Sequence, residues 1–273
     1  MKVPVYSMKG KASKSSATLP SAFDEPVRLD LIRRAVKAAR ANRRQAYGAS
    51  KRAGLRHSVS WPGKGRGMAR TPRKNGGGGR GAEAPNTVGG RRAHPPKVEK
   101  EWDQKINSKE RKKAFRSALA ATSQEAYVHA RGHVIPNKAK LPYVVDNKIE
   151  SIAGDHEGES LTKRAMSLLD GLGIGEDVDR AHSGKGIRAG KGKRRGRKYR
   201  NPRSVLVVLS ESNGSERAFR NLSGVDVTTA RDLNTELLAP GGDPGRLVVF
   251  LSLIHISEPT RPLYISYAVF CLK

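Results

Sequence analysis

The chain has very little cysteine, few aromatic residues, few acidic residues and no long hydrophobic run. Its 273 residues include a single cysteine, and aromatic residues make up 5% of the chain. One cysteine excludes a disulfide framework and a zinc site built from cysteines. No apolar run approaches the roughly 18 residues needed to span a bilayer, and no apolar stretch follows the first lysine as in a secretory signal. These absences predict a cytoplasmic protein with no membrane partner.

Basic residues are abundant where acidic residues are few. The chain holds 53 Lys and Arg residues against 25 Asp and Glu residues, which gives a formal net charge of +28. A field this positive attracts polyanions, so nucleic acid is the expected partner. The length suits one domain with appendages or two small domains.

Most of this charge is concentrated in two segments. Residues 48–100 hold 13 basic and two acidic side chains, and residues 180–203 hold 11 basic side chains and no acidic one. The rest of the chain has the modest charge of an ordinary globular domain. We therefore expect a globular body formed by residues 1–47 and 101–250. The first basic segment is inserted in this body, and the second is a basic loop within it.

The first segment, residues 48–100, has the composition of an extended loop. It holds 12 glycines, several prolines and few large apolar residues. Such a segment buries too little apolar area to offset its conformational entropy, so we do not expect it to fold alone. Glycines let the backbone approach a ligand closely, and arginines present forked donors that match phosphate geometry. A solvated linker is the alternative, but a linker has no need of 13 positive charges.

The second segment, residues 180–203, has glycines and lysines like a phosphate-binding P-loop but lacks its spacing. Its glycines are one residue too close together, and Gly192 stands where Ser or Thr would bind magnesium. The glycines at 171–175 also fail as a dinucleotide fingerprint, because they follow a helical pattern rather than a strand. Contact with the phosphates of a polyanion is the better interpretation of both stretches. Tyr199 either stacks on an exposed base or packs against the body.

The remaining sequence alternates between helical and strand patterns. Apolar spacing predicts helices over 27–45, from Asn107, over 160–172, over 216–222 and from Thr229. Strands are predicted at 3–6, 143–145, 205–209, 225–227 and 247–250. The fold class is therefore α/β, a three-layer α/β/α domain with a mainly parallel sheet, plus a long basic Gly-rich extended loop. Glu110, three residues after Asn107, matches a capping box. The arginines of the first helix either face solvent or contact RNA at the last turn.

Candidate catalytic and metal-binding groups are scattered. His129 and His133 are four residues apart, as in a metal-binding pair on one helix face, but Gly132 lies between them and no third ligand is adjacent. No nucleophile elbow is present. His156 stands between two acidic residues in a Gly-rich turn that is typical of a solvated loop. The sequence therefore predicts neither an enzyme nor a cofactor nor a metal site.

Several motifs, in order along residues 1–250, carry a family resemblance. The most telling are the runs GRRAHPPK at 90–97, RSALAAT at 116–122 and RGRKYR at 195–200. Through them the chain resembles the large-subunit ribosomal protein L4 family in its archaeal and eukaryotic form. The resemblance implies a structural constituent of the large ribosomal subunit that binds large-subunit ribosomal RNA and neighbouring ribosomal proteins. It also implies that the extended loop aids assembly and lines the peptide exit tunnel, where it meets the nascent peptide.

The resemblance also implies which side chains contact RNA. The motif alignment places five residues near the loop tip: Arg66, Arg70, Arg73, Lys74 and Arg80. It places four on the returning limb: Arg91, Arg92, His94 and Lys97. Arg56 and Lys64 are further candidates in the first segment. The second segment supplies Lys191, Lys193, Arg194, Arg195, Arg197, Lys198, Tyr199 and Arg200.

Two other functions compete with this one. A nonspecific RNA- or DNA-binding basic protein outside the ribosome explains the charge but not the α/β body. A nucleotide-dependent enzyme needs a phosphate loop after a strand, which neither Gly-rich segment provides.

The sequence changes character after Phe250. Residues 251–261 and 265–272 match, in frame, the translated ends of a transposase sequencing adapter, and the three residues between them fit the gap left by a sample index. We therefore interpret residues 251–273, which include Cys271, as the artefactual tail of a truncated gene. A natural apolar tail is the alternative.

Overall fold

The computed structural model describes residues 1–136, 139–153, 160–211 and 214–252. The chain divides into two compact units. One comprises residues 1–39 together with the residues from Lys105 onward, and we call it the body; the other, residues 40–104, we call the insertion. The insertion is wider than the predicted segment 48–100, because aromatic and basic side chains just outside that segment pack within it.

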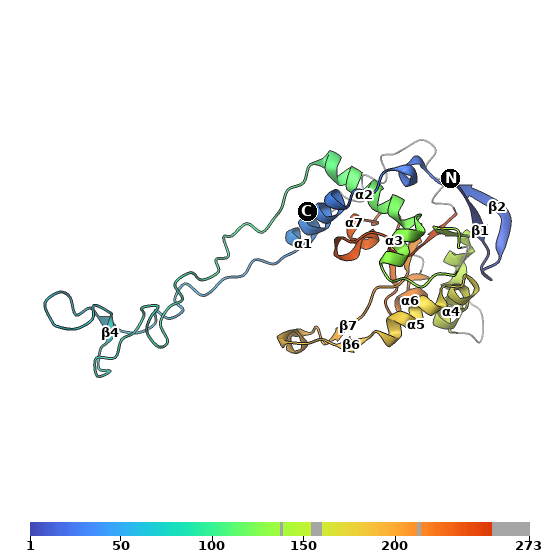
Figure 1. Ribbon diagram of the computed structural model, residues 1–273. Helices are drawn as coiled ribbons and strands as arrows, with labels where there is room; N and C mark the ends of the chain where they lie inside the picture. The colour runs from blue at the N-terminus through green and yellow to red at the C-terminus, as the bar shows by residue number, and fades with distance from the viewer. Residues whose placement is uncertain (137–138, 154–159, 212–213, 253–273) are drawn as a thin grey trace. The chain divides into compact units, whose positions relative to one another are not determined.

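A six-stranded sheet in the order β2-β1-β5-β10-β8-β9 forms the middle layer of the body. Figure 1 labels β1 and β2 at one side of this sheet. Its strands are β1 (Lys2–Tyr6), β2 (Ala12–Thr18), β5 (Tyr143–Val145), β8 (Leu206–Leu209), β9 (Asp226–Thr229) and β10 (Val248–Leu251). β2 runs antiparallel to β1, and the other neighbouring strands are parallel. The central strands β5, β8 and β10 are buried along their whole length, as their unbroken aliphatic runs predict.

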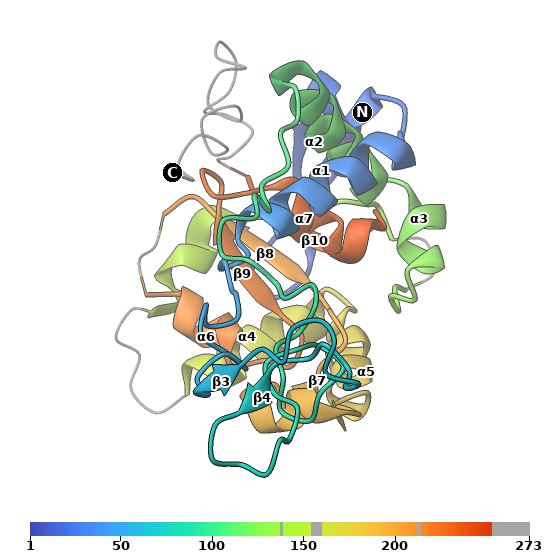
Figure 2. The same ribbon diagram turned by 90° about the vertical axis from the view of Figure 1, so that its left-hand side faces the viewer.

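Helices cover both faces of this sheet, so the predicted three-layer α/β/α body is confirmed (Figure 2). One face carries α1 (Leu29–Asn42), α2 (Ser108–Thr122) and α7 (Thr235–Leu238); the other carries α4 (Leu161–Gly171), α5 (Gly175–Ser183) and α6 (Glu216–Arg220). Successive residues of β8 enter opposite cores: Val208 packs with the first set and Val207 with the second. The short helix α3 (Glu125–Ala130) follows α2 and adds Val128 to the second core. In the described part of the body, 3-10 turns outside the basic hairpin are η1 (Ser21–Asp24), η2 (Asn147–Ala153) and η4 (Pro240–Gly242).

The predicted start of the last helix is wrong. β9 continues to Thr229 and a turn follows, so α7 begins only at Thr235. The side chain of Asn234 caps this helix by accepting a hydrogen bond from the Leu237 backbone N–H at 2.9 Å. A β-branched Thr therefore ends a strand here, and the capping Asn five residues later begins the helix.

The predicted capping box of α2 does not form. Asn107 occupies the N-cap position but its side chain makes no capping hydrogen bond. Glu110 instead accepts a hydrogen bond from Arg34 of α1 at 3.2 Å. An ion pair between two helices thus replaces the local contact.

The glycines at 171–175 pack α4 and α5 closely and do not form a phosphate loop. A Cβ atom on Gly171 would lie 2.7 Å from the carbonyl oxygen of Lys9, and a Cβ atom on Gly175 would lie 1.9 Å from Asp170 Oδ1. The backbone contact at Gly171 leaves no room for a side chain, and a side chain at Gly175 would displace the Asp170 carboxylate, so close packing explains both glycines.

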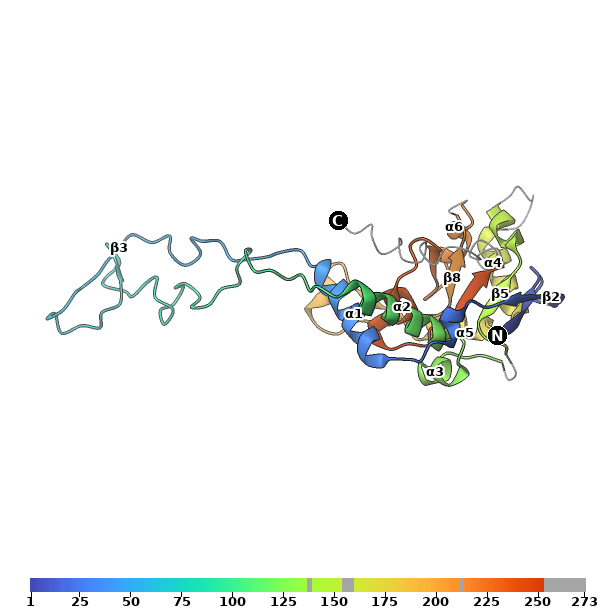
Figure 3. The same ribbon diagram turned by 90° about the horizontal axis from the view of Figure 1, so that it is seen from above.

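The insertion consists of two limbs that run alongside each other (Figure 3). The Ala49 N–H donates to the carbonyl of Pro96 at 3.1 Å, which joins the outgoing limb to the returning one. A Cβ atom on Gly54 would lie 2.4 Å from the Arg91 backbone nitrogen, so glycine is required at this close contact between the limbs. The strands β3 (Val59–Ser60) and β4 (Arg73–Lys74) pair antiparallel further along.

Candidate nucleic-acid interface

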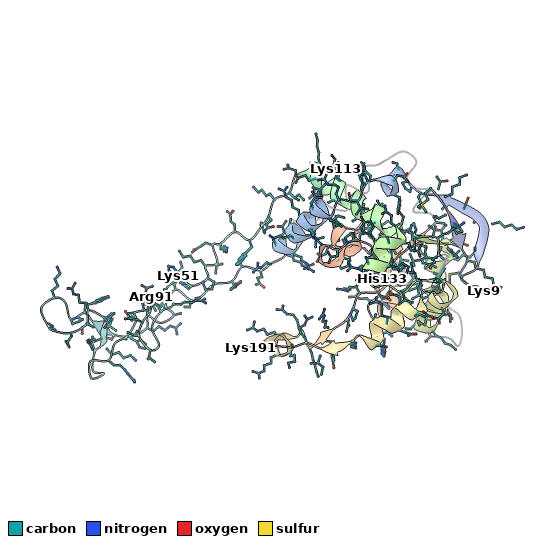
Figure 4. The ribbon with its side chains drawn as sticks, in the orientation of Figure 1. Lys9, Lys51, Arg91, Lys113, His133 and Lys191 are labelled. Carbon is teal, nitrogen blue, oxygen red and sulfur yellow. The ribbon has the colours of Figure 1, made fainter. Side chains whose placement is uncertain are left out.

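The second basic segment forms a hairpin between α5 and β8, which we call the basic hairpin (residues 184–203). β6 (Gly186–Ile187) pairs antiparallel with β7 (Tyr199–Arg200), and the 3-10 turn η3 (Lys191–Arg195) closes the end marked by Lys191 in Figure 4. Gly190 and Gly196 flank this turn with φ values of 77° and 75°. Because other residues rarely adopt positive φ, glycine is favoured at both positions where the chain enters and leaves the turn.

All the predicted contact residues of the basic hairpin are exposed: Lys191, Lys193, Arg194, Arg195, Arg197, Lys198, Tyr199 and Arg200. The hairpin contains no acidic residue, and in the described part of the chain no ion pair involves a residue between Lys185 and Arg200. Its positive charge is therefore not neutralised by the protein, and a polyanion is its complementary partner.

Tyr199 does not pack into the body. Its side chain is 50% exposed, and its cross-strand neighbour Ile187 is 65% exposed. The ammonium nitrogens of Lys185 and Lys198 lie 5.0 and 5.4 Å from the centre of the Tyr199 ring. This exposure argues against packing of Tyr199 on the body. Stacking of Tyr199 on an RNA base stays a prediction.

A buried carboxylate holds the base of the basic hairpin. Asp177 of α5 is fully buried and accepts hydrogen bonds from Arg180 Nε at 2.9 Å, Ser204 Oγ at 2.6 Å and the Val134 N–H at 3.0 Å. Arg180 also donates through Nη2 to the carbonyl of Arg203 at 2.9 Å. The two ends of the hairpin are thereby joined to each other and to the core.

His133 contacts the same carboxylate, with Nδ1 3.0 Å from Asp177 Oδ2. Burial alone raises the pKa of Asp177, but hydrogen bonds from His133, Arg180 and Ser204 outweigh burial and lower the pKa to about 2. Burial lowers the pKa of His133 below its usual value, so the neutral ring donates from Nδ1. His133 and Ser204 both bond to the carboxylate rather than to each other, so this cluster is no nucleophile–base pair.

The two histidines of the rejected metal pair lie in different environments. His129 is exposed beside Glu125, at 3.3 Å, whereas His133 is buried. Over the described residues, no three His, Cys, Asp or Glu side chains gather as metal ligands would. His156 lies outside the described residues.

The predicted contact residues of the insertion fall into two groups. Nine have exposed side chains: Arg56, Lys64, Arg66, Arg70, Arg80, Arg91, Arg92, His94 and Lys97. Arg73 and Lys74 are only partly exposed because they lie in β4. Arg73 also donates through Nη1 to the Gly79 carbonyl, so it holds the Gly-rich turn at the tip. Figure 4 shows Lys51 and Arg91 on the two limbs.

Sequence reasoning missed an aromatic contact within the insertion. The rings of Tyr47 and Trp102 stack with centroids 5.7 Å apart and planes 16° apart. The Arg44 guanidinium carbon lies 3.9 Å from the centre of the Trp102 ring. The sequence did hold a signal for this contact. Aromatic residues make up only 5% of the chain, yet one stands on each side of the 53-residue basic segment.

A layered α/β body with two exposed cationic segments defines a basic protein suited to polyanions. Comparison with known proteins identifies the family of this basic protein. Residues 17–255 match the model of the ribosomal protein L4/L1 family. The chain belongs to this family, and the nonspecific nucleic-acid-binding alternative is not favoured.

Curated relatives from archaea support the assignment, and each is named large ribosomal subunit protein uL4. The chain is 47% identical over 250 residues to the protein of Halobacterium salinarum, with 92% of this chain and 96% of that protein covered. It is 48% identical to the Methanopyrus kandleri protein over 254 residues, with coverages of 92% and 95%. It is 49% identical to the Pyrobaculum aerophilum protein over 251 residues, with coverages of 91% and 86%. No helix in the described ranges has the length and apolarity to cross a bilayer.

Proposed function

We propose that this protein is a non-enzymatic structural constituent of the large ribosomal subunit in the cytoplasm, where it binds large-subunit ribosomal RNA and neighbouring ribosomal proteins. The observation that carries the proposal is that the family match, residues 17–255, includes both cationic segments. The insertion and the basic hairpin both expose many cationic side chains, as phosphate contacts require.

The insertion, which includes the extended loop predicted at residues 48–100, is proposed to thread between RNA helices during assembly. Its glycines make the unbound chain easy to deform, and ordering on RNA is offset by phosphate contacts and counterion release. The tip, with Arg66, Arg70 and Arg80, is proposed to line the peptide exit tunnel and to meet the nascent peptide. The exposed side chains of these three residues are consistent with that role.

Deletion of residues 57–93 tests the proposal. The cut removes the outer part of the insertion and leaves the body intact, so we expect a folded protein that assembles poorly into large subunits. Circular dichroism checks the fold, and sucrose-gradient sedimentation measures the yield of subunits. Normal subunit yield with an unchanged tunnel in a cryo-EM reconstruction contradicts the role of the insertion.

Co-sedimentation at high salt separates this function from nonspecific binding. A protein integrated into the subunit resists washing, whereas a protein held only by phosphate contacts dissociates steeply as salt rises. We expect the full chain to stay with large subunits through the wash. Its complete release would favour a peripheral basic protein instead.

A further inference from the structure

A cavity of about 460 Å³ lies within the insertion, close to its two ends. Its volume falls in the range of roughly 300–1,000 Å³ that is typical of small-ligand pockets. Its walls combine two prolines with six other side chains, those of Tyr47, Arg92, His94, Lys97, Lys100 and Trp102. Aromatic, cationic and imidazole groups therefore converge on one site.

The aromatic wall of the cavity, formed by Tyr47 and Trp102, is stabilised by contacts with neighbouring side chains. Trp102 is partly buried, stacks on Tyr47 and carries the Arg44 guanidinium and the Lys100 ammonium at 3.9 and 4.5 Å from its ring centre. Tyr47 is 54% exposed despite this stacking. Trp102 thus acts as the support, and Tyr47 presents an aromatic face that is open to a ligand.

The polar wall carries only one sign of charge. Arg92, Lys97 and Lys100 line the cavity, and no acidic side chain does. Within the described part of the chain, the side chains of Arg92, His94 and Lys97 make no hydrogen bond and no ion pair. Their donors are therefore available to an anionic ligand that also has a flat apolar part.

We propose that this cavity holds one unstacked nucleotide of ribosomal RNA, with its base on the ring of Tyr47 and its phosphate between Arg92 and Lys97. The inference rests on the proposed RNA-binding function and adds a base contact to the phosphate contacts. Any base offers a π-face to an aromatic ring, so the cavity selects a nucleotide that is free of its helix rather than a particular base.

The test uses tryptophan fluorescence of the full chain. The chain has two tryptophans, so the Trp61→Phe variant leaves Trp102 as the only reporter, at the cavity itself. The probes are a short oligoadenylate and an abasic ribose-phosphate oligomer of the same length and charge. We expect the oligoadenylate to quench Trp102 and to bind about ten-fold more tightly than the abasic oligomer.

Variants at Tyr47 then separate stacking from charge. In the Trp61→Phe background, Tyr47→Leu is expected to remove the preference for the base-bearing probe, and Tyr47→Phe to keep it. Neither change alters the salt dependence of binding, since neither removes a cation. Tyr127→Leu is the control: Tyr127 is a partly exposed tyrosine of α3 outside the predicted contact residues, so its change should leave quenching of Trp102 unchanged.

The possible failures are distinguishable. Equal affinities for the two probes, with a steep salt dependence for both, overturn the nucleotide cavity and leave RNA binding intact. The absence of binding to either probe counts against the proposed function itself. Loss of base preference in Tyr47→Phe as well as Tyr47→Leu overturns stacking as the mode of recognition.

Discussion

The guanidinium of Arg246 lies beside the carboxylate of Asp226, with Nη2 2.7 Å from Oδ2, and Arg246 is completely buried. Arg246 also donates through Nε to the Ser204 carbonyl at 3.0 Å and through Nη1 to the Leu237 carbonyl at 3.1 Å. Arg203 lies on the outer side of the same carboxylate, with Nη1 2.6 Å from Asp226 Oδ1. One carboxylate therefore has a buried partner and an exposed partner.

Replacing these two arginines should have very different effects on stability. Arg246→Leu leaves a carboxylate and several carbonyls without their buried donor, so we expect the free energy of unfolding to fall by about 3–5 kcal/mol. Arg203→Ala removes a half-exposed ion pair and should cost no more than about 1 kcal/mol. Urea denaturation of both variants measures the difference. Similar losses in the two variants would show that burial does not govern this network.

The cluster around Asp177 predicts that acid destabilises the protein in two steps. Burial lowers the pKa of His133 in the folded protein. Below about pH 6.5 the unfolded chain therefore binds a proton at this histidine more readily than the folded chain does, and the free energy of unfolding falls as the pH drops. The folded pKa of Asp177, about 2, lies below its unfolded value of 3.8, so its contribution of about 2 kcal/mol is lost between about pH 4 and pH 2.

Unfolding free energies measured from about pH 8 to about pH 2 check this prediction. The variant His133→Gln removes the first titrating group, and its stability should stay flatter between pH 7 and pH 5 than that of the unmodified chain. His129→Gln is the control, because His129 is exposed. Identical profiles for all three proteins would contradict the prediction.

The contact between Gly10 and the end of α4 predicts a position that tolerates no side chain. Gly10 has a φ of +73°, and a Cβ atom there would lie 2.0 Å from the carbonyl carbon of Gly171. Gly10→Ala should therefore lower the free energy of unfolding by about 2–4 kcal/mol, through backbone strain and overpacking together. Gly241→Ala is the matched control: its φ is +88° with no atom within 4 Å, so only strain of about 1–2 kcal/mol remains. Equal melting temperatures would refute close packing at Gly10.

The cations of the basic hairpin should determine part of the salt dependence of RNA binding. Changing Lys193, Arg194 and Arg195 to Gln removes three exposed charges. If each contacts one phosphate, the slope of log affinity against log salt should fall by about two to three. Filter binding to protein-free large-subunit RNA measures the slope.

Three lysines elsewhere provide the control for that experiment. Lys9, Lys11 and Lys14 are exposed at the β1–β2 edge of the sheet, and their change to Gln removes the same charge. Figure 4 places Lys9 at the β2 edge. A slope that falls equally in both triple variants would mean that RNA binding depends on the net charge of the protein and not on the position of the hairpin cations.

The adapter-like sequence of residues 251–273 predicts that the natural gene differs from the present one after codon 250. We propose that these residues derive from a sequencing adapter, and residues 253–273 lie outside the described structure. Amplification of the gene from its source across codon 250 should give a different coding sequence beyond Phe250. Independent reads without adapter that continue into the present tail would overturn this interpretation.

The sequence predicted the layered body because its strongest signals are periodic and apolar. The aliphatic run at 205–209 gave a buried strand, and the spacing in 160–172 gave a helix. β2 was missed because its sequence, ASKSSAT, is almost entirely polar, as an exposed edge strand can be. α5 was missed because its short charged sequence, GEDVDRAHS, has too few apolar positions to show a helical period.

The sites were less predictable than the fold, because burial of polar groups depends on distant parts of the chain. Arg246 appears as one more cation in a basic sequence, and only its packing against Asp226 distinguishes it. Likewise, Asp177 meets His133 across 44 positions of the chain. The exposed cations of the two basic segments were readable from composition, whereas the stacking of Tyr47 on Trp102 needed the fold of the insertion.

The closure of the hairpin base by Arg180 and Arg203 has a consequence for the order of events on RNA. Because both ends of the hairpin are fixed when the body folds, part of its conformational entropy is already lost before it meets RNA. On the proposed function, the Gly-rich insertion loses most of its entropy only when it meets RNA. We propose that the preordered hairpin docks first on an RNA surface of matching shape, and that the insertion then adapts to that surface.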